Sequence, residues 1–313
     1  MNETGPNDSP RHGGPTSGSG RWGTPEGKAG SLGNRIWLAL GGGGLKGLAH
    51  IGAWRAVNET GVRISGLVGT SIGSLVGVLA ASGVGWEEMR DMALELRRED
   101  IVRVNRRAVL FNGIRQVSVF RGDILREYYQ RILPPLGWDA LGMPVLVNAV
   151  DLATGRTQWF GPGARLDVSL LDAVYASSAL PLFYPPAVID GRAFVDGGTE
   201  HPLGLFQAAH MGATGIIGVD VGAGEEGKTE RILRQGMLAV HQRIFSIMTY
   251  RRRRDLIAQW TDPPLLYVRP QLDGYETFDF DSVEYFMEEG YRATMEVLML
   301  HKRESGDSGA GGA

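Results

Sequence analysis

The pentapeptide Gly69-Thr70-Ser71-Ile72-Gly73 follows a short apolar segment and opens a run of small residues from Ile72 to Ser82. This order predicts a buried strand that turns sharply into a helix, with glycines beside the turn because larger side chains would collide there. A serine on such a turn presents its hydroxyl outward, next to the first free amides of the helix. The same residues also fit an ordinary connection in which Thr70 or Ser71 caps the helix. The pentapeptide alone therefore leaves both interpretations open.

A glycine-rich loop, residues 41–47, lies upstream of this turn and directly follows the apolar segment Ile36 to Leu40. Its residues Gly42, Gly44 and Gly47 match the GxGxxG pattern of dinucleotide-binding turns. Such a site expects an acidic residue at the end of the next strand, where this chain has the serine turn instead. A nucleotide cradle and a purely structural turn therefore remain alternatives to the main interpretation.

We interpret the glycine loop as an oxyanion hole. A serine that attacks a carbonyl needs amide donors about 3 Å from the developing oxyanion, commonly the amide after the nucleophile and one from an upstream loop. Adjacent parallel strands would bring the amides of Gly42, Gly43 and Gly44 and the amide of Ile72 to one edge of a sheet. Glycines would leave these amides open to a substrate.

The serine needs a base within hydrogen-bonding distance, because a free hydroxyl is a weak nucleophile. Asp196 is the main candidate, since it follows Phe194 and Val195 at a predicted strand end, where functional groups of open α/β sheets gather. A carboxylate with an ordinary pKa of about 4 is a poor base, so a pair of Ser71 and Asp196 depends on strong oxyanion stabilisation. His201, five residues further on, keeps a Ser-His-Asp triad open as the alternative.

Strand-like and helix-like segments alternate along the chain, which predicts an α/β fold with three α/β/α layers and a mostly parallel central sheet. Asp151 and Asp220, near the ends of predicted strands, are interpreted as turn or capping residues. Further strands are expected at 144–150 and 216–219, a hairpin around Asp190-Gly191, helices at 86–96, 123–133 and 283–300, and one long or two shorter basic helices at 231–260.

A single domain over residues 34–302 is expected, with a motif-bearing core at 35–222 and a helical C-terminal part at 223–302. Residues 1–33 are rich in Gly, Ser, Pro, Asn and Thr, and residues 303–313 have a similar composition. Both segments are therefore predicted to be disordered tails.

The composition narrows the classes of function. A formal net charge of -3 at pH 7 gives no reason to expect nucleic-acid binding. The chain has no cysteine, which excludes disulfides and thiolate chemistry and suits a reducing compartment. It also lacks an apolar run of the roughly 18 residues that span a bilayer, and its first residues lack the apolar core of a secretory signal. These features predict a cytoplasmic protein, with peripheral contact at the inner face of the membrane left open.

Three segments, GGGGLKGLAHIGA, GTSIGS and VDGG, together resemble the patatin-like phospholipase family, whose marks are a GxGxxG loop, a GxSxG serine and an Asp-Gly-Gly or Asp-Gly-Ala turn. Further similarity runs through VDLATGR, YASSALPLFYPP and IIGVDVG towards Gly290-Tyr291, so the resemblance covers about residues 35–300. Lys46 occupies a position that the family often fills with Arg.

The resemblance implies a serine acyl hydrolase that cleaves fatty-acyl esters of phospholipids or lysophospholipids without a metal or organic cofactor. In this assignment Ser71 is the nucleophile, Asp196 is the general base, and the amides of Gly42 to Gly44 and of Ile72 form the oxyanion hole. An acyl-enzyme would form before water releases the fatty acid. The accompanying motif glycines are Gly47, Gly69, Gly73, Gly197 and Gly198.

Two apolar segments, residues 110–120 and 180–186, are candidates to hold the acyl chain, although core packing explains them equally well. Arg251 to Arg254, with Arg243 nearby, are interpreted as a solvated helix face, and contact with anionic lipid headgroups is the alternative. The rival functions are a Ser-His-Asp carboxylesterase that uses His201 and a non-enzymatic protein that binds nucleotides or lipids.

Overall fold

The computed structural model describes residues 31–105, 110, 115–222, 224 and 229–307. The tails expected at residues 1–33 and 303–313 lie mostly outside these ranges. Within them, Leu32 is buried beside Gly215, and the last helix continues to Asp307. The described structure therefore extends beyond residues 34–302 at both ends.

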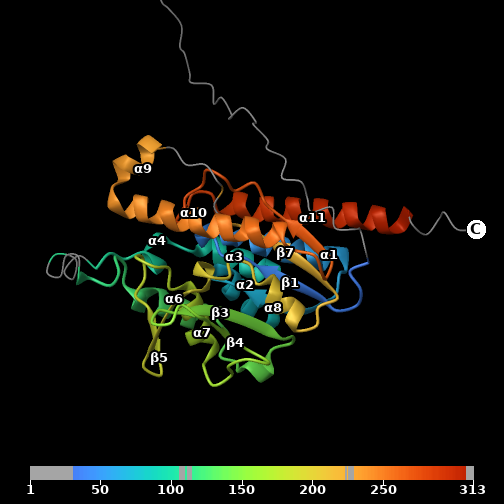
Figure 1. Cartoon of the computed structure of the whole chain (residues 1–313), viewed down its shortest axis with the longest axis horizontal. Helices are drawn as coiled ribbons and strands as arrows, with labels where there is room; N and C mark the ends of the chain where they lie inside the picture. Colours follow the sequence, from blue (N-terminus) through green and yellow to red (C-terminus); the bar gives the residue numbers. More distant parts are fainter. Residues whose placement is uncertain (1–30, 106–109, 111–114, 223, 225–228, 308–313) are drawn as a thin grey trace, which may run out of the picture.

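A mixed sheet forms the centre of the molecule, with the strand order β5-β6-β3-β2-β1-β7-β8 and with β4 paired to β3 (Figure 1). The strands β3, β2, β1, β7 and β8 run parallel, and antiparallel pairing is confined to the end that holds β4, β5 and β6. Their bounds are β1 (Ile36–Leu40), β2 (Ile64–Gly69), β3 (Val145–Asp151), β4 (Thr157–Phe160), β5 (Ala187–Ile189), β6 (Arg192–Asp196), β7 (Gly215–Val219) and β8 (Leu265–Val268).

Helices cover both faces of this sheet, which confirms the expected α/β fold (Figure 1). The described α-helices are α1 (Ala49–Thr60), α2 (Ile72–Ala81), α3 (Trp86–Glu95), α4 (Arg98–Ile101), α6 (Gly122–Ile132), α7 (Leu170–Ser178), α8 (Leu205–His210), α9 (Thr229–Gln235), α10 (Met237–Ala258) and α11 (Val283–Asp307). Short 3-10 turns are η1 (Gly44–Leu48), η3 (Trp138–Ala140) and η4 (Gly197–Thr199).

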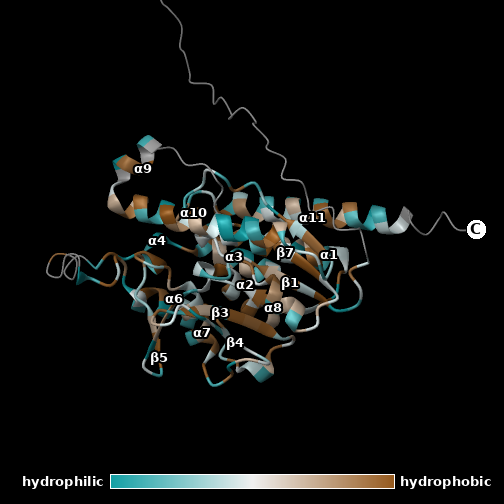
Figure 2. Ribbon diagram, viewed as in Figure 1, coloured by the Kyte–Doolittle hydropathy of each residue, from teal (hydrophilic) through white to brown (hydrophobic). Residues whose placement is uncertain are grey.

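Two cores lie on opposite faces of the sheet because side chains alternate along each strand. Leu38 and Leu40 of β1 belong to the larger core under α1, α2 and α11, whereas Trp37 and Ala39 belong to the smaller core under α8. The brown strands at the centre of Figure 2 show how apolar the sheet is. The basic segment at 231–260 forms two helices, α9 and α10, that are separated by Gly236 in a left-handed conformation.

None of the helices in the described part of the chain is long and apolar enough to cross a membrane.

A buried ion cluster ties α10 to the end of β7. Asp220 is almost fully buried and accepts from Arg269 at 2.9 Å and from the Tyr267 hydroxyl at 2.6 Å, and Arg253 of α10 lies 3.0 Å away. The two guanidinium groups outweigh the effect of burial and lower the pKa of Asp220 to about 2. Asp220 also accepts from the Gly222 amide at 2.9 Å, so it is the turn residue that the sequence indicated and in addition pairs with two arginines. Asp151 likewise accepts from the turn amides of Ala153 and Thr154.

We expect Asp220→Asn to lower the free energy of unfolding by about 3–5 kcal/mol at pH 7, because the buried Arg253 and the partly buried Arg269 lose their shared anion. Urea unfolding followed by circular dichroism measures this. Asp255→Asn removes an exposed partner of Arg254 and should change stability by less than about 1 kcal/mol. Equal effects of the two substitutions would contradict the role assigned to Asp220.

Candidate active site

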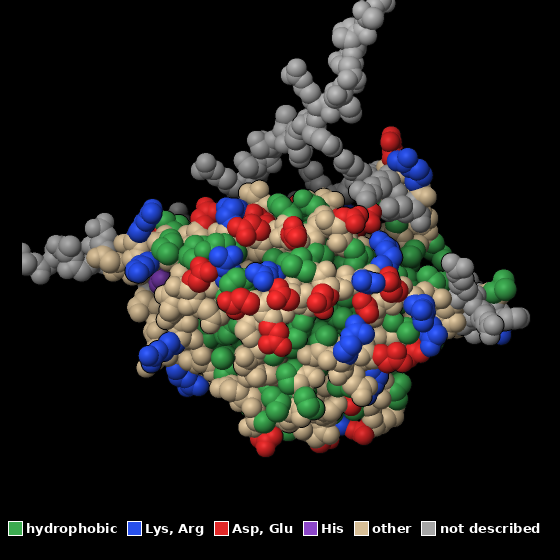
Figure 3. Space-filling view, turned by 180° about the vertical axis from the view of Figure 1, so that it is seen from behind, with side chains coloured by type: hydrophobic (Ala, Val, Ile, Leu, Met, Phe, Trp, Pro, Cys, Tyr) green, Lys and Arg blue, Asp and Glu red, His purple; other side chains and the backbone are tan. Residues whose placement is uncertain are grey.

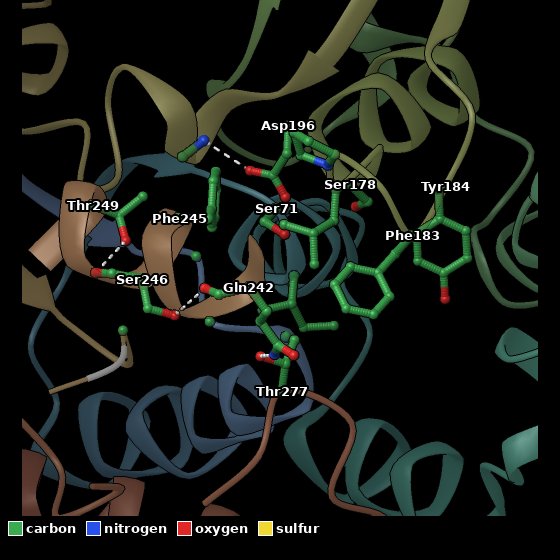
Figure 4. A pocket seen from close by; sticks show the side chains of 18 of the residues that line it. Ser71, Ser178, Phe183, Tyr184, Asp196, Gln242, Phe245, Ser246, Thr249 and Thr277 are labelled. Carbon is green, nitrogen blue, oxygen red and sulfur yellow. Dashed lines mark hydrogen bonds between the residues drawn. The ribbon is translucent and has the colours of Figure 1, made fainter. Parts of the chain in front are cut away.

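The strand register brings Ser71 and Asp196 together. Gly69, at the end of β2, pairs with Val147 of β3, and Ala149, two residues further along β3, pairs with Asp196. Ser71 also lies two residues beyond its paired position, so it comes alongside Asp196 (Figure 4). Asp196 thus lies at the carboxyl edge of β2 and β3, although its own strand, β6, runs antiparallel to β3.

Ser71 occupies a strained turn. Its φ of 56° and ψ of -128° lie in a region that residues with side chains rarely adopt. The amide of Ser71 donates to Ser177 Oγ at 2.9 Å, which holds this conformation against α7. The hydroxyl interacts with the Asp196 carboxylate, and Figure 4 shows the two side chains pointing toward each other. The backbone thus aims the hydroxyl at the carboxylate.

The motif glycines permit close approach between the two loops. A Cβ atom at Gly47 would lie 1.8 Å from Cγ2 of Ile72, and one at Gly73 would lie 2.3 Å from the carbonyl oxygen of Leu40. Gly69 faces the backbone of Ser74 in the same way. The start of α2 can therefore sit directly beside the glycine loop only when these positions lack side chains.

Three of the four proposed oxyanion donors have unused N–H groups. The amides of Gly43, Gly44 and Ile72 donate to no other group in the part of the chain that the structure describes. The Gly42 amide differs from the expectation, because it donates to the Pro202 carbonyl oxygen at 3.2 Å. The remaining donors lie at the N-terminal ends of η1 and α2, where the helix dipoles favour a negative charge.

Asp196 is buried, and among the residues that the structure describes no cationic side chain forms an ion pair with it. Burial raises its pKa from 3.8 to about 6, although the neighbouring Ser71 hydroxyl and the Gly198 amide, which donates to the carboxylate, oppose the shift. The Gly198 bond is 2.7 Å long, and Gly197 packs against the Asn148 side chain, where a Cβ would clash. The Asp-Gly-Gly turn therefore fixes the carboxylate in place and keeps its basicity well above that of an ordinary aspartate.

A largely apolar cavity of about 330 Å³ opens onto the Ser71 hydroxyl. Leu180 to Tyr184 form part of its wall, and α10 covers it with residues such as Phe245 (Figure 4). The described part of segment 110–120 does not line it, and its Phe120 packs against Phe183 with ring centroids 5.4 Å apart. Because α10 and the 180–184 segment cover the serine, Ser71 is buried and not presented at the surface as expected.

The histidine alternative gains no support. The His201 ring packs against Trp159, with centroids 5.9 Å apart, and is not among the residues that line the cavity. His50 is buried beneath the glycine loop, where its Nε2 lies 2.7 Å from the Gly41 carbonyl oxygen. Burial lowers the pKa of His50 to about 4, so the ring is neutral at pH 7. Its role in the structure is to support the loop.

Lys46 is also buried and lines the cavity. Desolvation lowers its pKa to about 8, even though Asp273 and Asp220 act in the opposite direction.

Sequence reasoning missed several supporting residues. Ser177 binds the amide of Ser71, and the Asn148 amide donates to the carbonyl oxygen of His201 at 2.9 Å, next to the Asp-Gly-Gly turn. The segment YASSALPLFYPP holds Ser177 and the cavity wall, so its presence in the resemblance was the one available signal. No local pattern indicates that α10 covers the site.

The sequence is similar to those of several known proteins. An uncharacterized NTE family protein of Mycobacterium tuberculosis is 34% identical over 198 residues, which cover 63% of this chain and 52% of that protein. Lysophospholipase NTE1 of Coccidioides immitis is 27% identical over 306 residues, which cover 88% of this chain and 18% of that protein. The chain thus spans about half the length of the mycobacterial relative and a smaller part of the fungal one.

The fold has a counterpart among solved structures. VipD from Legionella pneumophila matches 87% of this chain and 68% of its own chain with a TM-score of 0.50, at 14% sequence identity. That likeness concerns the fold alone. A family model described as patatin-like phospholipase matches residues 38–209, which is more than half of the sequence and includes both Ser71 and Asp196. The chain therefore belongs to the patatin-like phospholipase family.

Proposed function

We propose that this chain is a serine acyl hydrolase that cleaves fatty-acyl esters of phospholipids or lysophospholipids, with Ser71 as nucleophile and Asp196 as general base. One observation carries the proposal: a serine in a strained turn faces a buried carboxylate inside an apolar cavity. Nucleophilic catalysis needs that pairing of an alcohol with a base. The family membership and the lysophospholipase name of the fungal relative support a lipid ester as the substrate.

The reaction begins when Asp196 accepts the proton of the Ser71 hydroxyl while Oγ attacks the ester carbonyl carbon. Negative charge moves to the carbonyl oxygen, where the amides of Gly43, Gly44 and Ile72 stabilise it. Collapse of the tetrahedral species breaks the ester bond, and protonated Asp196 returns its proton to the departing alcohol. The acyl group remains attached to Ser71.

Deacylation repeats these steps with water as the nucleophile. Asp196 takes a proton from water, the resulting hydroxide attacks the acyl carbonyl, and Ser71 leaves as the alcohol after it regains the proton. The apolar wall from Leu180 to Tyr184 offers a place for the fatty-acyl chain during both steps. The raised pKa of Asp196 makes its carboxylate a stronger base than an ordinary aspartate.

A fluorophosphonate probe tests the assignment of the nucleophile. We expect strong labelling of the wild-type chain, none of Ser71→Ala, and at least roughly hundredfold slower labelling of Asp196→Asn, since general-base assistance contributes that much. Gel fluorescence after timed labelling measures the rates. His201→Ala serves as the control and should label as wild type does. Equal labelling of all four proteins would exclude the mechanism.

The pH dependence tests the general base. Asp196 must be deprotonated to accept the serine proton, and burial raises its pKa to about 6. We therefore expect kcat/KM for a short-chain ester to be constant above this pKa and to fall about tenfold per pH unit below it. A rate that stays constant down to the pKa of an ordinary aspartate would contradict the role of a buried, desolvated Asp196.

The same carboxylate should lower stability at neutral pH. Its folded pKa of about 6 exceeds the ordinary 3.8, so between these values the folded state holds a proton that the unfolded state has lost. Stability therefore falls as pH rises through this window, by about 3 kcal/mol in total. Asp196→Asn removes this penalty, and we expect it to melt at a higher temperature than wild type at pH 8.

Thermal unfolding followed by circular dichroism at several pH values measures the difference. The stabilisation by Asn should shrink as the pH falls through the window and should be absent near pH 3.8, where the aspartate is protonated in the folded protein. A variant that is less stable than wild type at pH 8 would show that Asp196 is not held in an unfavourable, desolvated state.

A further inference from the structure

An apolar stripe runs along the outer face of α10. It consists of Met237, Val240, Ile244 and Met248, which are spaced by three or four residues and so share one side of the helix. Between 36% and 74% of each side chain is exposed, although residues of this type are usually buried. Brown segments on α10 and on the neighbouring α9 mark this region in Figure 2. The stripe thus forms a continuous apolar face without a partner in the described structure.

The α10 stripe continues into the cavity. Ile244 and Met248 are exposed at the surface and also belong to the cavity wall that contains Ser71. The opposite side of α10 is held to the protein by Arg253, which pairs with Asp220, and by Gln242, which binds Thr277. The helix therefore presents its apolar side outward next to the entrance of the site, and the inward side carries its anchoring contacts.

Arginines flank the stripe. Residues 237–254 include five arginines and no acidic residue, and one of the five, Arg253, is buried against Asp220 and does not face the surface. Arg251 continues the exposed face directly after Met248. Arg252 and Arg254 form exposed pairs with Glu200 and Asp255, which contribute little stability and can be exchanged for other anions. The face in Figure 3, seen from behind, mixes acidic with basic side chains instead.

We propose that the α10 stripe docks on an anionic lipid bilayer, with the apolar side chains in the acyl boundary and the arginines at the headgroups. Apolar residues next to basic ones on one helix face are the combination that binds such an interface. Docking in this orientation places the cavity entrance against the bilayer, so a lipid can pass to Ser71 without crossing water. Only this last consequence rests on the proposed function, because docking itself needs no hydrolysis.

Vesicle sedimentation of the full chain tests the docking. The Ser71→Ala background keeps the lipid intact, and vesicles of phosphatidylcholine mixed with phosphatidylglycerol are compared with pure phosphatidylcholine. Into this background we introduce Met237→Glu with Val240→Glu, which lie outside the cavity wall. Leu152→Glu with Val188→Glu is the matched control, since both are exposed apolar residues outside α10: Leu152 follows β3, and Val188 lies in β5. Thermal unfolding by circular dichroism verifies that each variant is folded.

We expect the stripe variant to bind mixed vesicles roughly tenfold or more weakly than its background, because two apolar side chains no longer enter the lipid. The control variant should bind as the background does, and pure phosphatidylcholine should bind less than the mixture. Equal binding by both double variants, or equal binding to both vesicle types, would overturn the proposal. The proposal would also be overturned if the chain did not bind vesicles and light scattering showed a dimer that becomes a monomer in the stripe variant.

Hydrolysis of a short-chain soluble ester by the chain with Ser71 intact reports on the proposed function separately. Vesicle binding without such hydrolysis would support the docking role of the α10 stripe and refute the catalytic proposal. Hydrolysis without vesicle binding would support the catalytic proposal and refute the docking role.

Discussion

The left-handed backbone of Ser71 is the constraint on which the site depends. A non-glycine residue in this region costs about 1–3 kcal/mol and persists only where its surroundings enforce it. Here the hydrogen bond with Ser177 and the contact of Gly73 with Leu40 enforce it from two directions. The β1 and β2 strands, α2 and α7 must therefore all be in place before the hydroxyl faces Asp196. The strain is located at the residue with the proposed chemical role.

Two buried aspartates show how the surroundings decide what a carboxylate does. Asp220 lies among Arg253, Arg269 and Tyr267, which stabilise its charge, lower its pKa and make it a structural anchor. Within the described part of the chain, the groups that favour the charged form of Asp196 are a serine hydroxyl and one amide, so burial dominates and its pKa rises. The first arrangement adds stability and the second gives up stability for basicity. An aspartate thus stabilises the fold at the end of β7, and another acts as the proposed base at the end of β6.

The sequence predicted the parts of the site that depend on local geometry. The strand-to-helix turn at Ser71, the glycine loop and the hairpin that ends at Asp196 each follow from neighbouring residues, and the family resemblance agreed with them. Long-range contacts were not predictable in this way. The Gly42 amide donates to Pro202, far along the chain, and α10 covers the serine because Arg253 reaches Asp220. Local patterns also could not give the direction from which β6 enters the sheet.

The position of β6 affects how the Ser71–Asp196 site is lost on heating. Asp196 belongs to the hairpin of β5 and β6 at one edge of the sheet, whereas Ser71 follows β2 near the middle of the sheet. Strands at the edge of a sheet unfold locally at a smaller free-energy cost than central strands. Local unfolding of β5 and β6 would separate Ser71 from Asp196 while the central strands stay folded. Loss of activity on heating therefore reflects the unfolding of this edge hairpin, whereas loss of secondary structure reflects the unfolding of the central strands.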